Sequence, residues 1–128
     1  MTKFIIDSYA WIEYLLSTEK GLKVKEILDN EENKIFTHIL SISEVTSRIS
    51  RAGENYSKSI ETIITISEII DVDINSSSKA GELHASVRKE IKDFGLVDAF
   101  ILLAAKDISA KILTGDPHFK NMKEAVMI

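Results

Sequence analysis

Short apolar runs alternate along the chain with segments in which apolar residues recur at helical spacing. Three runs begin with a lysine and have the character of buried strands: Lys3–Ile6, Lys34–Thr37 and Lys111–Thr114. A further strand is expected at Ile70–Val72 and a weaker one near Val126. The pattern therefore predicts several short strands separated by helices.

Apolar residues three and four positions apart predict three helices in the first half of the chain. The first has Ser8 as its N-cap, and Gly21 separates it from the second. The third runs from about Ser41 to near Gly53. Their apolar stripes are Trp11, Ile12, Leu15 and Leu16; Val24, Ile27 and Leu28; and Ile42, Val45 and Ile49.

The second half of the chain is expected to hold three more helices. The segment 55–70 is interpreted as a helix on its length, although residues 62–66 are β-branched throughout and would also suit a strand. Ser76 or Ser78 caps the next helix, Phe94-Gly95 closes it, and a very apolar helix follows. The inward residues of the capped helix are Ala80, Leu83, Val87 and Ile91.

Strands that alternate with helices predict an α/β fold: one domain over residues 1–128, an α/β/α sandwich around a mainly parallel sheet. In such sheets, functional groups gather at the carboxyl ends of the strands. No repeat, linker or low-complexity segment divides the chain.

Composition excludes several kinds of site and of cellular location. A formal net charge of −4 argues against a basic surface over the whole molecule, and the lack of cysteine excludes disulfides and thiolate metal sites. No apolar run reaches the roughly 20 residues of a membrane span, and no leader segment precedes the first strand. We therefore expect a cytoplasmic protein without a membrane contact.

Asp98 is the only polar side chain in the stretch from Phe94 to Ala105. The helix that begins there is apolar on every face, which predicts that it is buried between other elements. An isolated buried carboxylate costs several kcal/mol or more. Asp98 therefore needs a strong partner, which an arginine, a group of donors or a cation would provide.

Three other acids deserve comparison with Asp98. Asp7 and Asp116 follow predicted strands, where each also suits an ordinary helix cap or turn. Glu44 has the spacing of a capping box with Ser41 and of an i,i+4 pair with Arg48, and it lies off the apolar stripe. Pattern alone places Glu44 on the surface.

An acidic cluster of Asp7, Asp98 and Asp116 would be unstable without compensation. Two carboxylates about 4 Å apart repel by up to about 4 kcal/mol at an effective dielectric of 20. Without a cation, at least one member should hold a proton. A divalent ion resolves the conflict, and oxygen ligands alone favour Mg²⁺ or Mn²⁺ over zinc.

Four blocks of the sequence, in this order and spacing, resemble the PIN domain family and most closely its VapC-type toxin ribonucleases. They are Phe4-Ile5-Ile6-Asp7-Ser8, Ser41-Ile42-Ser43-Glu44-Val45, Leu96-Val97-Asp98-Ala99-Phe100-Ile101 and Ile112-Leu113-Thr114-Gly115-Asp116-Pro117-His118-Phe119. The resemblance covers essentially the whole chain and implies a sheet with helices on both sides.

The resemblance also implies a catalytic and metal-binding site made of Asp7, Glu44, Asp98 and Asp116. Glu44 thereby moves from the surface into the site, a change that its own pattern does not supply. Two further positions, Ser8 and Thr114, match hydroxyl groups that support the site in the family. His118 stands where many members carry another acid. A surface or capping role is the common one for such a histidine, and a contact to phosphate or water beside the metals is the alternative.

The activity implied by the resemblance is Mg²⁺- or Mn²⁺-dependent hydrolysis of RNA phosphodiester bonds, by the toxin of a type II toxin–antitoxin pair. The implied partners are RNA, a small VapB-like antitoxin protein and a second copy in a homodimer. In the family an antitoxin segment enters an apolar groove bordered by the first helices.

Other interpretations stay open. The chain could be an RNA-processing PIN nuclease outside a toxin–antitoxin system, or a catalytically silent PIN-like binding module. Phosphoryl transfer through Asp7 would normally show an Asp-x-Asp pair, and the sequence has Asp7-Ser8-Tyr9. Arg88, Lys89 and Lys92 suit either a solvated helix face or a guide for RNA phosphates, while His38 and His84 lack ligand spacing.

Overall fold

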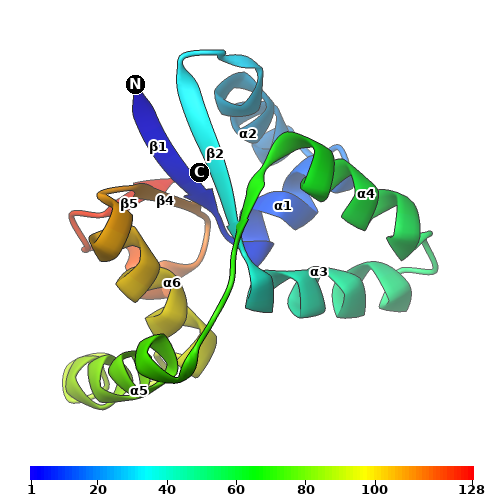
Figure 1. Cartoon of the computed structure of the whole chain (residues 1–128). Coiled ribbons are helices and arrows are strands. Elements are labelled where there is room, and N and C mark those ends of the chain that lie inside the picture. Colours follow the sequence, from blue (N-terminus) through cyan, green and yellow to red (C-terminus); the bar gives the residue numbers. More distant parts are fainter.

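In the computed structural model, which covers residues 1–128, five strands form one sheet in the order β3-β2-β1-β4-β5 (Figure 1). All four pairings between neighbouring strands are parallel, which confirms the expected fold class. The strands are β1 (Thr2–Ile6), β2 (Asn33–His38), β3 (Glu68–Ile70), β4 (Lys111–Thr114) and β5 (Ala125–Met127).

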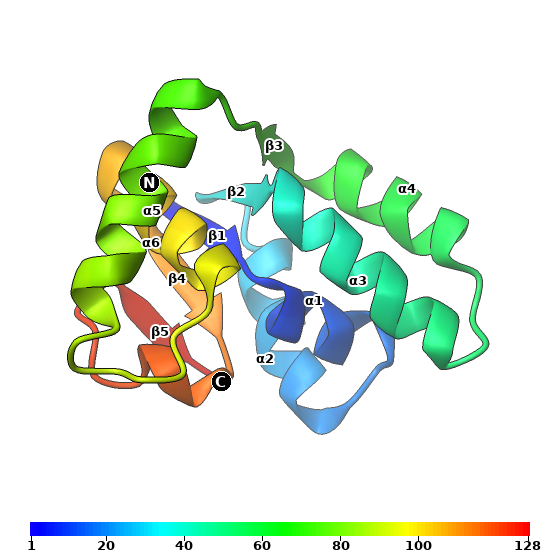
Figure 2. The same ribbon diagram turned by 90° about the horizontal axis from the view of Figure 1, so that it is seen from below.

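Helices cover both faces of the sheet (Figure 2). One face carries four helices and the other carries two. The first group is α1 (Ser8–Leu15), α2 (Glu19–Asp29), α3 (Ile39–Arg51) and α4 (Tyr56–Ile66), and the second is α5 (Ile74–Val87) and α6 (Leu96–Ile108). A 3₁₀ turn, η1 (Pro117–Phe119), follows β4.

Successive side chains of a strand point to opposite faces of the sheet, and each face has its own hydrophobic core. Phe4 and Ile6 of β1 pack with Trp11 of α1 in one cluster, and Ile5 packs with Ile101 of α6 in the other. Because successive side chains of a strand point to opposite faces, a short buried strand supplies both cores. The central strands are therefore almost continuously apolar, as the sequence predicted.

Three helix starts differ from the sequence-based predictions. The Asp7 side chain, not Ser8, caps α1 by accepting a hydrogen bond from the Ala10 amide (2.9 Å). Asp73, not Ser76 or Ser78, caps α5, and Ser76 returns a bond to the Asp73 amide. Both Asp and Ser are good caps, so sequence alone could not rank these neighbours.

The cap of α3 is His38, whose Nδ1 accepts from the Leu40 amide (3.1 Å). The capping box predicted for Ser41 and Glu44 is therefore wrong, because both residues already lie inside the helix. The i,i+4 ion pair between Glu44 and Arg48 does not form either. Neither of the ordinary roles proposed for Glu44 is realised.

Gly21 does not separate two helices but lies in the first turns of α2. A Cβ atom at this position would lie 2.3 Å from the Glu13 carbonyl oxygen, so α1 and α2 approach each other at this glycine. Two other boundaries shift: β3 ends at Ile70 rather than continuing to Val72, and α5 ends at Val87, before Ile91.

The α6 helix is not buried on every face. Ala99, Ile101 and Ala105 point into the core, whereas Leu96 is 52% exposed and Phe100 is half-buried. Asp98 is likewise half-buried, so the predicted full burial of this residue is wrong. None of the helices combines the length and the apolar character needed to cross a bilayer.

Candidate metal centre

The acids singled out from the sequence meet at the carboxyl edge of the sheet. Asp7 directly follows β1, and Asp116 lies two residues after β4, the neighbouring strand. Ile6 and Leu113 are register partners, so the two strands end side by side. Asp98 reaches the same edge from the first turn of α6.

Asp7 is the most buried of these acids, with 6% of the residue exposed. One carboxylate oxygen caps α1, and the other accepts a hydrogen bond from the Thr114 hydroxyl. The pKa of Asp7 is raised to about 7, chiefly by burial; the two hydrogen bonds oppose this shift, and the charges of Asp116 and Asp98 contribute to it.

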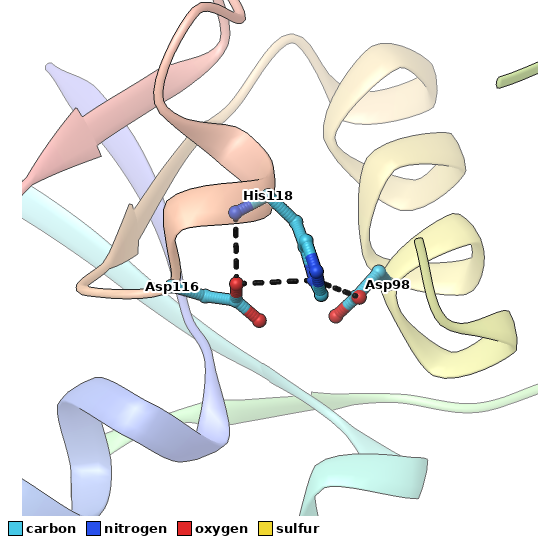
Figure 3. A group of neighbouring side chains, drawn as sticks. All are labelled: Asp98, Asp116 and His118. Atoms are coloured by element: carbon cyan, nitrogen blue, oxygen red, sulfur yellow. Dashed lines mark hydrogen bonds and ion pairs between the residues drawn. The ribbon is translucent and has the colours of Figure 1, made fainter. Parts of the chain in front are cut away.

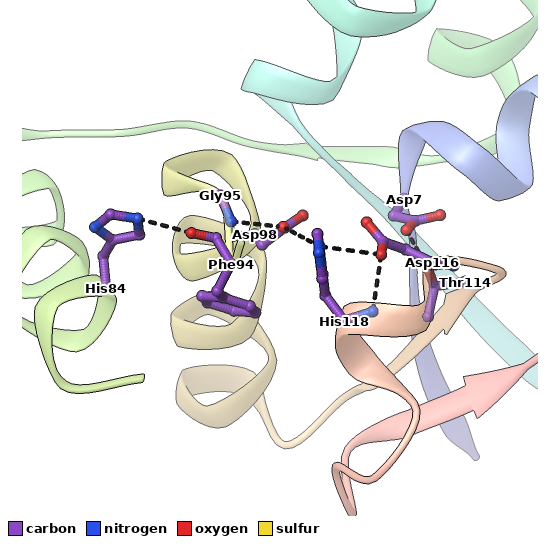
Figure 4. Close-up of polar contacts among 8 residues, drawn as sticks. All are labelled: Asp7, His84, Phe94, Gly95, Asp98, Thr114, Asp116 and His118. Carbon is purple, nitrogen blue, oxygen red and sulfur yellow. Dashed lines mark hydrogen bonds and ion pairs between the residues drawn. The ribbon is translucent and has the colours of Figure 1, made fainter. Parts of the chain in front are cut away.

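Thr114 connects two of the acids. Its hydroxyl donates to Asp7 and accepts from the Asp116 amide at 2.9 Å (Figure 4). Thr114 is itself fully buried, so it holds its geometry without competition from water. This is a supporting position of the kind that the family resemblance implies.

Asp98 has partners other than an arginine. Its Oδ2 accepts from the Gly95 amide (3.0 Å) and lies 3.5 Å from Nδ1 of His118. Burial raises the pKa of Asp98, the Gly95 bond opposes this, the charge of Asp116 adds to it, and His118 opposes it. The carboxylate is therefore oriented by the backbone, and its charge is offset only in part.

His118 points into the cluster rather than to the surface, which corrects the role favoured by the sequence. Its Nδ1 lies 3.2 Å from Asp116 Oδ1 and 3.5 Å from Asp98 Oδ2, between the two carboxylates (Figure 3). The same Asp116 oxygen accepts from the His118 amide (2.9 Å). Asp116-Pro117-His118 is a turn signal in the sequence, but it does not indicate the direction of the ring.

Glu44 lies at the edge of this group. Much of the residue is exposed, yet burial of its carboxyl end raises its pKa, and the charges of Asp98 and Asp116 raise it further. A hydrogen bond with Ser8 opposes the shift. Glu44 therefore senses the other acids, although it does not belong to the closest set, Asp98, Asp116 and His118, whose ligand atoms all lie within 4.8 Å of one another.

The donor set fits a divalent metal ion. No lysine or arginine forms an ion pair with Asp7, Glu44, Asp98 or Asp116. Three of these acids have raised pKa values, and in each case the charge of another acid contributes. Carboxylate oxygens that repel one another and lack a cationic side chain form the kind of site that a hard divalent cation stabilises.

The other two histidines have local bonds. Nδ1 of His38 caps α3, and Nε2 of His84 lies 2.9 Å from the Phe94 carbonyl oxygen. Neither belongs to the group that could hold a metal.

Comparison with known proteins identifies the family and the fold. The sequence matches the PIN domain family over residues 4–125, and no curated protein matches it by sequence.

Three similar solved structures have low sequence identity to this chain. The Mycobacterium tuberculosis toxin VapC20, which cleaves the sarcin–ricin loop, has a TM-score of 0.77 at 14% identity, over 94% of this chain and 95% of that one. DNA-bound VapBC from Salmonella typhimurium has a TM-score of 0.74 at 17% identity, over 100% and 98%. A Klebsiella pneumoniae toxin–antitoxin complex has a TM-score of 0.67 at 19% identity, over 96% and 95%.

Proposed function

We infer, from the premise that this chain belongs to the PIN domain family, that it is a metal-dependent endoribonuclease of the VapC type. The observation that carries the proposal is the meeting of Asp7, Asp98 and Asp116 at one sheet edge without a lysine or arginine partner. The carboxylates of Asp98 and Asp116 are the principal metal ligands, with Asp7 and Glu44 beside them.

A bound Mg²⁺ or Mn²⁺ would supply Lewis-acid chemistry, by polarising the phosphodiester and lowering the pKa of water. Asp7 is held in place by Ala10 and Thr114, so its carboxylate is oriented before substrate arrives. Glu44 is accessible from solvent and has a raised pKa. It accepts the proton of the attacking water at its carboxylate.

Three basic residues and two acidic ones, Glu90 and Asp93, occupy the segment that leads to this acidic edge. The exposed Arg88, Lys89 and Lys92 lie in the segment that leads from α5 to Gly95, which in turn bonds Asp98. Basic side chains there contact RNA phosphates and offset the net negative charge of the protein. The salt dependence of RNA binding reports this contribution.

The chain acts as the toxin of a type II toxin–antitoxin pair in the cytoplasm, as a homodimer of one-domain subunits (residues 1–128). All five strands, from Thr2 to Met127, share one sheet, which supports the single domain. Toxin–antitoxin complexes among the similar structures support a VapB-like partner. A cavity of about 440 Å³ between α1, α3 and α4 is lined by three apolar residues, Leu15, Leu16 and Ile49, and by five polar ones, and is the site for an amphipathic antitoxin segment.

Cleavage of RNA by the purified protein, with Mn²⁺, with Mg²⁺ and with EDTA, tests the proposal. Asp98→Asn should abolish metal-dependent cleavage while the fold survives, because an amide oxygen still accepts the Gly95 bond. Asp107→Asn, on the exposed side of α6, is the matched control and should stay active. Full activity of Asp98→Asn would refute the proposal, and RNA binding without cleavage by the unmodified chain would favour the silent module.

A further inference from the structure

The acidic cluster contains one nitrogen atom whose surroundings are unusual. Nδ1 of His118 is buried and has no hydrogen-bond partner. Its nearest polar neighbours are two carboxylate oxygens, from Asp98 of α6 and Asp116 of the loop after β4. A buried polar atom without a partner is rare in folded proteins and calls for a ligand or an ion.

The distances around Nδ1 match those between neighbouring ligands of one metal ion. Nδ1 lies 3.2 Å from Asp116 Oδ1 and 3.5 Å from Asp98 Oδ2. Two adjacent ligands that each lie about 2.1 Å from an octahedral ion are about 3 Å apart, and opposite ligands are about 4.2 Å apart. The largest separation within the group, under 4.8 Å, is of the same size. Only small side-chain movements separate this arrangement from a three-ligand site.

Each of the three ligands is held by a contact other than those between the ligand atoms. The Gly95 amide fixes Asp98 Oδ2, and the His118 amide fixes Asp116 Oδ1. The imidazole ring of His118 packs edge-to-face with Phe94, at 6.5 Å between ring centroids. Hydrogen bonds and packing contacts around metal ligands orient them and strengthen metal binding.

We propose that His118 is a nitrogen ligand of the metal ion and that it makes the site select Mn²⁺ over Mg²⁺. The proposal rests on the metal centre of the proposed function. Mg²⁺ binds through oxygen and is strict about its geometry, whereas imidazole nitrogen is a good ligand for transition-metal ions. The site is therefore not the all-oxygen centre that the sequence suggested.

A different arrangement would give His118 another role: a cationic imidazolium that forms ion pairs with Asp98 and Asp116 in place of a metal. In that case a divalent ion would compete with His118, and removal of the imidazole would strengthen metal binding. A nitrogen ligand predicts the opposite, so the two roles can be separated by measurement.

Electron spin-echo spectroscopy of Mn²⁺ bound to the full chain tests the ligand directly, without reference to cleavage. The wild type should show ¹⁴N modulation that changes when histidine is labelled with ¹⁵N. His118→Asn should lose it, and His84→Gln should keep it, because His84 lies outside the group. Absence of histidine modulation in Mn²⁺-loaded wild type would overturn the proposal.

Calorimetric titration gives the second readout. His118→Asn should weaken Mn²⁺ binding by at least about 10-fold, because loss of even an outer-shell partner costs about 10- to 100-fold, and should weaken Mg²⁺ binding much less. His118→Asp, which restores an oxygen ligand, should lower the Mn²⁺/Mg²⁺ affinity ratio while retaining Mg²⁺. An unchanged ratio would refute the inference about His118 alone. Failure of the wild type to bind either ion would refute the proposed function as well.

Discussion

The hydroxyl of Thr114 donates a hydrogen bond to the carboxylate of Asp7, a residue 107 positions earlier in the chain. The bond joins the ends of β4 and β1, and Thr114 also accepts from the Asp116 amide. One hydroxyl therefore sets the distance between the first acid of the chain and the last acid of the site.

Replacement of Thr114 by valine, which has nearly the same shape, should destabilise the protein by about 1–3 kcal/mol, because the buried Asp7 carboxylate then loses a donor. It should also raise the pKa of Asp7 further, since this bond lowers it. Urea denaturation at pH 7.5 measures the change. Thr114→Ser keeps the hydroxyl and should recover most of the stability; equal losses in both variants would assign the effect to packing.

The metal-free protein should lose stability as pH rises from about 4 to about 7. The pKa of Asp7 is 3.8 in the unfolded reference and about 7 in the folded protein, so the folded state holds a proton that the unfolded chain has released. Titration of Asp7 lowers the free energy of unfolding by on the order of a few kcal/mol over this pH range. Asp98 and Glu44, whose pKa values are also raised, act in the same direction.

Asp7→Asn isolates this effect, because asparagine is an equally good helix cap but does not titrate. In EDTA it should be more stable than the wild type at pH 8 and show a flatter pH dependence. His38, whose pKa burial lowers, contributes with the opposite sign, but it is common to both proteins and cancels in their difference. Parallel stability curves for the two proteins would contradict the role assigned to Asp7.

Addition of Mn²⁺ should raise the thermal stability of the wild type in proportion to the logarithm of the ion concentration. At 100 times Kd the gain is about 2.7 kcal/mol. Asp116→Asn should lose most of this shift, since it removes a charged ligand from the closest group. Differential scanning calorimetry provides the comparison, and an equal shift in the variant would place the ion elsewhere.

Gly21 and Gly81 form a matched pair for the packing of helices. Gly21→Ala should destabilise the protein by about 1–3 kcal/mol, because its Cβ would meet the Glu13 carbonyl oxygen at 2.3 Å. Gly81 lies within α5 with no atom near the position of a Cβ, so Gly81→Ala should stabilise by about 0.5–1 kcal/mol. Similar effects of the two substitutions would contradict the close approach of α1 and α2.

Periodicity predicted the strands and most helices because both faces of the central strands are buried. It did not predict which of two neighbouring polar residues caps a helix: Asp7 and Ser8 have similar cap preferences, and tertiary contacts with Thr114 decide between them. Edge strand β3 was placed too late because it is three residues long and half-buried.

In the candidate site, too, some residues could be found from the sequence pattern and others only from the fold. Asp98 attracted attention because a polar residue interrupts an apolar run, and strand ends located Asp7 and Asp116. Glu44 carried no local signal, since its only relation to the others is spatial. His118 was predicted as a lesser, supporting position, and only the fold of the Asp116–His118 turn places its ring nitrogen between two acids.

The parallel pairing of β1 with β4 has a consequence for synthesis of the protein. The two walls of the candidate metal centre lie far apart in the sequence, and the β4 wall is translated long after the β1 wall. Asp7 and Asp116 meet only after β4 has left the ribosome and paired with β1. The order of the strands thus delays assembly of the acidic edge until this long-range pairing has formed.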